Sequence, residues 1–251
     1  MAASSYVISY HAIRKLIGIL GLTLPFLCLG VNSIVNGLDL LNDSRFIDDE
    51  KSRPYLAGAN LKSSISHYYY TAAGPIFTGI LITVAIFLFC YKGYPLQRRK
   101  DYWYWLTDNR LATFAAGCAL GIVALPTGSG EPITDNIHIY VASEGAGSMH
   151  LIFAALFFLA MSVFCIINFR RHPDEPRKLK TDREGKLYLV CGCGMIASLL
   201  ILAVYSFTPL SKTAWLPYWF VYLMETIMLI FFGVAWLVKG RTIPALNKDE
   251  E

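Results

Sequence analysis

Six long apolar stretches, separated by charged connections, constrain the 251-residue chain more than any other feature. Each stretch has about 20 residues, the length of helix that crosses a hydrocarbon layer of about 30 Å. Backbone polar groups find no water inside a bilayer, so each stretch is predicted to be helical. We therefore expect an all-α polytopic membrane protein, a six-helix transmembrane bundle. The predicted spans are residues 16–35, 72–91, 111–127, 149–169, 187–207 and 220–238.

The composition excludes an ordinary soluble domain. Hydrophobic residues make up 55% of the chain and charged residues 16%, against roughly a quarter charged in soluble domains. Six spans and their connections account for the sequence, so we expect one transmembrane domain over residues 1–251. The six cysteines lie in or beside the apolar stretches, which indicates neither a disulfide framework nor a zinc site in a loop.

The basic residues predict the orientation. Successive connections are alternately rich and poor in Lys and Arg, and with the N-terminus inside, 17 of the 22 basic residues are cytoplasmic. The positive-inside rule then places both termini in the cytoplasm. An odd number of spans would break the alternation. We interpret the basic cluster at residues 98–100, beside aromatic residues 102–105, as a juxtamembrane anchor, and we expect no nucleic-acid partner.

The candidate functional residues lie near the predicted outer ends of the spans. Glu225 stands out, because a carboxylate roughly 10 Å inside a membrane helix is costly unless it is paired, protonated or hydrated. His67 and His150 are natural partners for it as metal ligands, proton relay or acid and base groups. Tyr222, one turn before Glu225, is placed to donate a hydrogen bond to it. The remaining candidates are Ser66, Asn32 and His138.

Each of these candidates also has a plain structural interpretation. Glu225 can tie its span to a neighbour, and each histidine can be an interfacial hydrogen-bonding residue. The tyrosines at residues 68–70 suit contact with a headgroup or sugar, and they suit an interfacial anchor equally well. The sequence leaves these alternatives open.

Two further patterns concern packing and the first outer connection. Residues 36–70 mix acidic and apolar side chains, and we expect a short helix or lid on the outer surface there. Small residues recur at helical spacing within two spans and predict close contacts between helices. They are Gly18 with Gly21, and Gly117 with Gly121.

Several short motifs resemble a group of known proteins. They are SISHYYYT at residues 64–71, FLFCYKGY at 87–94, LPT at 125–127, His150 with FAALFF at 153–158, and WLVKG at 236–240. Together they resemble uncharacterised bacterial six-helix membrane proteins, which are distantly similar to the DRAM/FRAG-type six-helix family. The resemblance implies six spans and a multi-pass location in the bacterial inner membrane, which is the plasma membrane. It implies no catalytic residue.

A second resemblance is partial. Ser66, His67 and His150 resemble elements of the membrane-embedded metal hydrolases of the alkaline ceramidase and adiponectin-receptor type. That family carries a His-x-x-x-His motif on its last span, whereas here Ala154 follows His150 by one turn and the last span has Glu225 without a histidine. Seven spans are also expected in that family.

The leading functional hypothesis is a non-enzymatic bundle that binds a membrane lipid or small amphiphile. Its polar pocket in the outer leaflet is expected to be lined by Glu225, His67 and His150. The alternatives are an intramembrane metal-dependent hydrolase that uses the same residues and a proton-coupled transporter. The leading hypothesis needs no cofactor, and the sequence leaves the ligand and the oligomeric state open.

Overall fold

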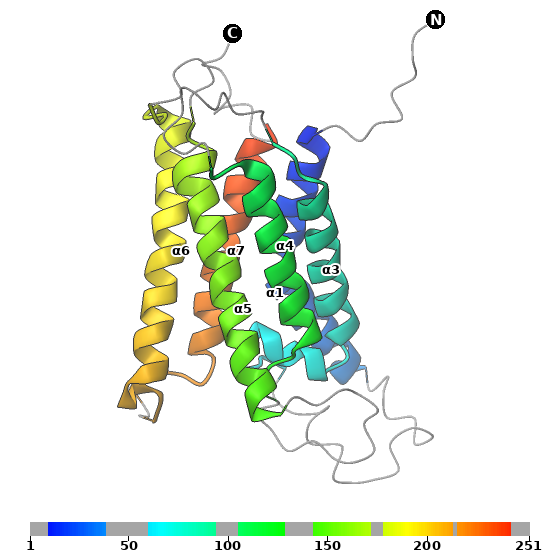
Figure 1. The fold of residues 1–251 in the computed structure, drawn as a ribbon. Helices are drawn as coiled ribbons and strands as arrows, with labels where there is room; N and C mark the ends of the chain where they lie inside the picture. The colour runs from blue at the N-terminus through cyan, green and yellow to red at the C-terminus, as the bar shows by residue number, and fades with distance from the viewer. Residues whose placement is uncertain are drawn as a thin grey trace, which may run out of the picture.

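The computed structural model describes residues 10–38, 60–93, 105–128, 143–171, 178–212 and 215–241. Within these ranges the regular elements are helices, apart from one isolated bridge between Arg171 and Leu179. The expected all-α fold is thereby confirmed. Figure 1 shows the long helices side by side, running alternately up and down. They are α1 (Tyr10–Gly37), α3 (Gly74–Cys90), α4 (Asp108–Ala124), α5 (Glu144–Val163), α6 (Arg183–Phe207) and α7 (Phe220–Lys239).

The six helices form a closed ring in chain order. Each packs against the next along the chain, and α7 packs against α1. In a ring of antiparallel neighbours, the last helix is antiparallel to the first only when the number of helices is even. Gly240, after the end of α7, accordingly lies beside the backbone of His11 and Lys15 near the start of α1.

The apolar helices of the bundle are compatible with an integral membrane protein. Four segments, residues 11–35, 145–168, 183–207 and 220–239, are long and apolar enough to cross a membrane, and α3 is a shorter apolar helix. Large apolar side chains point outward, including Ile86 (53% exposed), Leu151 (62%) and Val190 (61%). An exposed apolar surface of this kind is compatible with contact to lipid.

The end of α4 differs from the predicted boundary. The helix ends at Ala124 instead of residue 127. Pro126 explains the early end, because proline disfavours the helical conformation at the preceding residue, here Leu125. The carbonyl groups of the last turn are consequently left without partners inside the helix.

The start of α5 also differs. The helix begins at Glu144 instead of residue 149, and Ser143 caps it by accepting a hydrogen bond from the Ala146 N–H group at 3.4 Å. The prediction that His150 opens the span was wrong, because this residue lies in the second turn of α5.

A short 3-10 helix, η1 (Ile65–Tyr70), precedes α3 and lies at the end of the bundle where α5 and α7 begin (cyan in Figure 1). We call this the η1 end, and the end where α1 begins the basic end. Of the connection at residues 36–70, where we expect a short helix or lid, residues 39–59 lie outside the described residues. So do His138, the basic cluster at 98–100 and the aromatic residues 102–104.

Small residues allow α1 and α7 to approach closely. A Cβ atom on Gly18 would lie 2.9 Å from the carbonyl oxygen of Gly233 on α7, and one on Gly21 would clash with the Phe232 ring. Gly121 meets Phe153 of α5 in the same way, whereas Gly117 has no neighbour within 4 Å. The predicted close contacts are confirmed at three of these four glycines.

Aromatic side chains fill the core in the half of the bundle nearer the basic end. Trp236 of α7 is fully buried and lies at the centre of this group. Its ring centroid is 5.3 Å from that of Tyr91, 5.6 Å from Phe164 and 5.1 Å from Phe169. These residues come from three separate parts of the ring, so the aromatic group joins helices that are not sequence neighbours.

Candidate functional site

Residues 63–67 at the start of η1 form the centre of the candidate site. Ser64 adopts an extended conformation and caps the 3-10 helix, since its Oγ atom accepts a hydrogen bond from the Ser66 N–H group at 3.2 Å. Polar side chains from α5 and α7 reach this segment from either side. We call Ser64, Ser66, His67, His150 and Glu225 the η1 cluster.

Glu225 of α7 contacts the first turn of η1. Each of its carboxyl oxygens lies 2.9 Å from Ser64 Oγ, and Oε2 accepts a hydrogen bond from the Ile65 N–H group at 2.6 Å. The first N–H groups of a helix have no partner within it. Glu225 therefore accepts a hydrogen bond from the first N–H group of η1. Its hydrogen bonds to Ser64 and Ile65 offset the free-energy cost of burying a carboxyl group on an apolar helix.

His150 of α5 is 1% exposed and uses both ring nitrogens. Nδ1 lies 3.0 Å from the carbonyl oxygen of Ile122 and 2.9 Å from that of Leu125, both freed by the early end of α4. Nε2 lies 2.9 Å from Ser66 Oγ. A carbonyl oxygen only accepts, so Nδ1 carries a proton, and in the neutral ring Nε2 accepts from the Ser66 hydroxyl group.

His67 lies on η1 beside the same segment. Its Nδ1 atom is 2.8 Å from Ser63 Oγ. Burial, together with the nearby positive charge of Lys62 and the proximity of His150, lowers the pKa of His67 to about 4. The ring is therefore neutral at pH 7, and it can donate or accept a hydrogen bond without adding charge to the site.

The other two candidates, Asn32 and Tyr222, make contacts beside this segment, and the Tyr222 N–H group donates to the carbonyl oxygen of Ser63 at 2.9 Å. Asn32 of α1 is buried, and its Nδ2 atom donates to the carbonyl oxygen of Asn60 at 3.2 Å. The Tyr222 hydroxyl group donates to the carbonyl oxygen of Pro25 at 3.0 Å. The predicted hydrogen bond from Tyr222 to Glu225 was wrong, because the single hydroxyl proton is directed at α1 instead.

The candidate residues thus meet on one short segment, but each has its own partner there. Glu225 contacts Ser64 and Ile65, His150 contacts Ser66, and His67 contacts Ser63. In the part of the chain that the structure describes, no three His, Cys, Asp or Glu side chains are grouped so that they could hold a metal ion. The geometry therefore gives the metal-dependent alternative no support.

Comparison with protein-family models, with curated proteins and with solved structures finds no match to this chain. The resemblance to bacterial six-helix proteins stays a prediction. The geometry of the two polar clusters is therefore the basis for the function proposed below.

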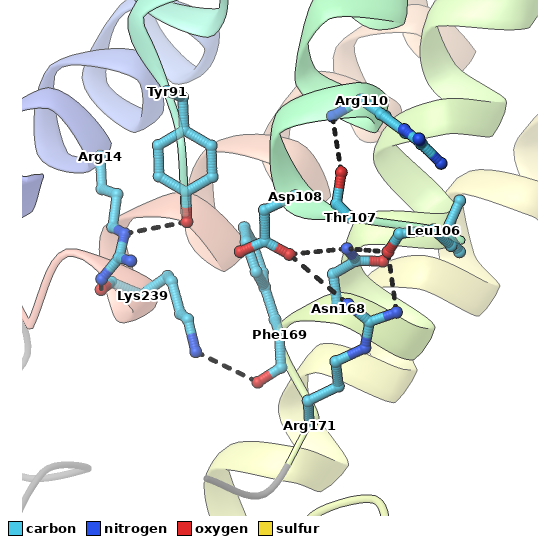
Figure 2. Close-up of polar contacts among 10 residues, drawn as sticks. All are labelled: Arg14, Tyr91, Leu106, Thr107, Asp108, Arg110, Asn168, Phe169, Arg171 and Lys239. Atoms are coloured by element: carbon cyan, nitrogen blue, oxygen red, sulfur yellow. Dashed lines mark hydrogen bonds and ion pairs between the residues drawn. The ribbon is translucent and has the colours of Figure 1, made fainter. Parts of the chain in front are cut away.

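Sequence reasoning missed a second polar group, at the basic end (Figure 2). It joins neighbouring ends of α1, α3, α4, α5 and α7, and we call Arg14, Asp108, Asn168, Arg171 and Lys239 the basic-end cluster. Arg14, only 3% exposed, donates from Nε to the Tyr91 hydroxyl oxygen at 3.2 Å and from Nη1 to the carbonyl oxygen of Lys239 at 3.4 Å. Lys239 Nζ donates to the Phe169 carbonyl oxygen at 3.2 Å.

Asp108 is the acidic member of this cluster. Its Oδ1 atom accepts from Asn168 Nδ2 at 2.7 Å and lies 3.9 Å from Arg171 Nη1 (Figure 2). Asn168 ends a π-helical turn, η2 (Phe164–Asn168), that follows α5. Gly93 packs against Asp108 with φ at 66°, where a Cβ atom would clash. The cluster therefore locks the ends of α3, α4 and α5 together.

Proposed function

We propose that this protein is an integral membrane protein with six spans and cytoplasmic termini that binds the headgroup of a phospholipid or similar amphiphile at the η1 end. The proposal makes the η1 end the outer end and the basic end the cytoplasmic one. The observation that carries the binding proposal is the partial exposure of four polar side chains of the η1 cluster. Ser64, Ser66, His67 and Glu225 are half-buried, so each keeps surface for a ligand.

The charges of the described residues support the orientation. Among the described Lys and Arg residues, only Lys62 and Lys212 lie at the η1 end. A positively charged end faces the cytoplasm in most membrane proteins. The basic residues at the opposite end are Arg14, Lys15, Lys92, Arg110, Arg170, Arg171, Lys178, Lys180, Arg183, Lys186, Lys239 and Arg241.

Charge and surface at the η1 end support a zwitterionic headgroup. Lys62 is a buried cation beside the cluster, only 3% exposed, and Glu225 supplies a carboxyl group. A phosphate at the surface near Lys62 and a cationic amine beside Glu225 would match these two charges. Exposed apolar side chains next to His150 on α5, Leu151 (62%) and Ile152 (50%), offer a surface for the acyl chains.

Photo-crosslinking tests the binding. The protein is purified in dodecyl maltoside with a trace of phosphatidylcholine that carries a diazirine on its acyl chain, and crosslinks are mapped by mass spectrometry. We expect crosslinks on residues 60–73 and 143–152 that excess lysophosphatidylcholine competes away. Glu225→Gln should lower their yield about tenfold, the change that about 1.4 kcal/mol produces.

Glu184→Gln is the matched control, since it is the same chemical change on α6 at the basic end, where Glu184 accepts from Lys180 Nζ at 3.4 Å. It should leave the crosslinks unchanged. Crosslinks spread evenly along the helices and insensitive to competitor would overturn the proposal.

Cysteine labelling tests the orientation separately. Lys212→Cys should react with a membrane-impermeant maleimide on intact cells, whereas Arg183→Cys should react only after permeabilisation. The wild-type protein, whose cysteines lie on the helices, gives the background. The reverse pattern would invert the proposed topology.

A further inference from the structure

Ser66 and His150 have the geometry of a nucleophile and its base. The Oγ atom of Ser66 lies 2.9 Å from Nε2 of His150, within the distance at which a base takes a hydroxyl proton. The two carbonyl oxygens at Nδ1 fix the ring tautomer, so Nε2 is the nitrogen free to accept that proton.

A third group usually orients the base in such a pair. In serine hydrolases an acidic side chain on the far nitrogen of the histidine holds the ring and stabilises its charged form. Here the carbonyl oxygens of Ile122 and Leu125 occupy that position, and their partial negative charges favour a proton on Nδ1. The ring is 1% exposed and cannot turn away without losing all three contacts.

The positions of the two residues suit a reaction at the bundle surface. Ser66 is half-buried on η1 and keeps some of its surface, whereas the base behind it is enclosed. The neighbouring pair of Ser63 and His67 has a similar separation of 2.8 Å, and its contact uses Nδ1 of the ring. The Ser66–His150 pair combines its 2.9 Å contact with two backbone carbonyl oxygens on the far nitrogen of the base.

We propose that Ser66 and His150 are the nucleophile and the base of an acyl-ester hydrolase acting on the amphiphile bound at the η1 end. This inference rests on the proposed function, because the bound ligand supplies the ester. The substrate class is an ester-linked phospholipid or lysophospholipid, and the co-reactant is water.

The reaction proceeds in two steps, acylation of Ser66 and hydrolysis of the acyl-serine. Ser66 Oγ forms a bond to the ester carbonyl carbon while its proton passes to His150 Nε2, and the ester C–O bond then breaks as the leaving alcohol takes that proton. Water next attacks the acyl-serine and gives a proton to Nε2, and the acid leaves as Ser66 Oγ takes the proton back. The products are a fatty acid and an alcohol, with the protein unchanged.

An alkyl fluorophosphonate tests the nucleophile directly. An activated serine displaces fluoride and becomes covalently labelled. We expect the full-length protein in dodecyl maltoside to be labelled on the peptide that contains Ser66, and Ser66→Ala to abolish the label. His150→Asn keeps an amide N–H near the position of Nδ1 for the carbonyl oxygens but removes Nε2, so labelling should fall on the order of 100-fold or more.

Ser162→Ala is the matched serine control, since Ser162 lies on α5 and donates to the Phe158 carbonyl oxygen at 2.8 Å, away from the cluster. Thermal unfolding of each variant separates loss of labelling from loss of fold. Release of fatty acid from lysophosphatidylcholine is measured in parallel.

The outcomes separate the two proposals. Labelling at Ser66 with release of fatty acid supports both. Saturable crosslinking of phosphatidylcholine without labelling or release overturns the hydrolase and leaves the binding function in place. Absence of both crosslinking and labelling in folded protein overturns both, and labelling that persists in folded His150→Asn overturns the role of His150.

Discussion

The two ends of this bundle use buried polar residues in opposite ways. At the basic end, cationic side chains donate to backbone carbonyl oxygens, and Arg171 forms an ion pair with Asp108 at 3.9 Å. Arg14 and Lys239 thereby join the start of α1, the end of α7 and the turn after α5. At the η1 end, hydroxyl and imidazole groups are arranged on a short 3-10 helix and remain partly exposed. The buried charges at the basic end therefore serve the fold, whereas the polar groups at the η1 end are partly exposed and available for a ligand.

The difference lies in what each cluster leaves accessible. Arg14 and Asp108 are 3% and 5% exposed, and their contacts close on the protein itself. Ser66 and His67 keep surface at the end of the bundle. If this comparison is right, substitutions at the basic end should change stability without changing ligand chemistry.

The largest expected loss of stability follows from Asp108→Ala. Removal of this carboxylate leaves Arg171 without its ion pair and Asn168 without its acceptor at 2.7 Å. Breaking a buried pair in this way costs about 3 kcal/mol. Denaturant unfolding in detergent should show that fall, while fluorophosphonate labelling of the folded fraction stays at the wild-type level. A loss of labelling equal to that of Ser66→Ala would break the division between the two ends.

A smaller effect is expected from Tyr222→Phe. The substitution removes the hydrogen bond to the Pro25 carbonyl oxygen between α7 and α1, which contributes about 1 kcal/mol. The same unfolding measurement checks it. Since Tyr222 does not donate to Glu225, crosslinking by phosphatidylcholine should persist in the variant. Loss of crosslinking would instead show that Tyr222 contributes to ligand binding.

The positions of the helices could be predicted from the sequence, and their exact ends could not. The apolar stretches predict the helices well, because a span must satisfy its own backbone and its length is set by the bilayer. Helix ends were less predictable, since they depend on single residues such as Pro126 and the capping Ser143.

The candidate site was predictable only in part. Glu225, His67 and His150 stand out as polar residues in or beside apolar stretches, and the structure brings each to residues 63–67. Their pairing was not predictable, because it depends on the depth of η1 and on the early end of α4, which are tertiary features. The basic-end cluster was missed because its Lys and Arg residues were interpreted as orientation signals. Thr107 caps α4, and Asp108 follows it in the first turn. This capping sequence was the available signal for a polar helix end at this position.

A further prediction concerns the pH dependence of stability. The pKa of His67 is about 4 in the folded protein because of burial, Lys62 and His150, and about 6.5 in an unfolded chain. Between these values the unfolded state binds a proton that the folded state does not, so stability falls as the pH drops from 6.5 towards 4. Above pH 6.5 the contribution vanishes. Unfolding of wild type and His67→Gln across this window should show a shallower slope for the variant, and parallel slopes would remove His67 from the buried site.

The most direct test of the comparison is stabilisation by a ligand. Lysophosphatidylcholine is titrated into wild type, Glu225→Gln and Asp108→Asn, and the unfolding temperature of each is followed. A ligand that binds only the folded state adds about 2.7 kcal/mol at one hundred times its Kd. Our account predicts a saturable rise in the unfolding temperature for wild type and Asp108→Asn, and a much weaker one for Glu225→Gln. An equal rise in all three proteins, or none in any, would contradict it.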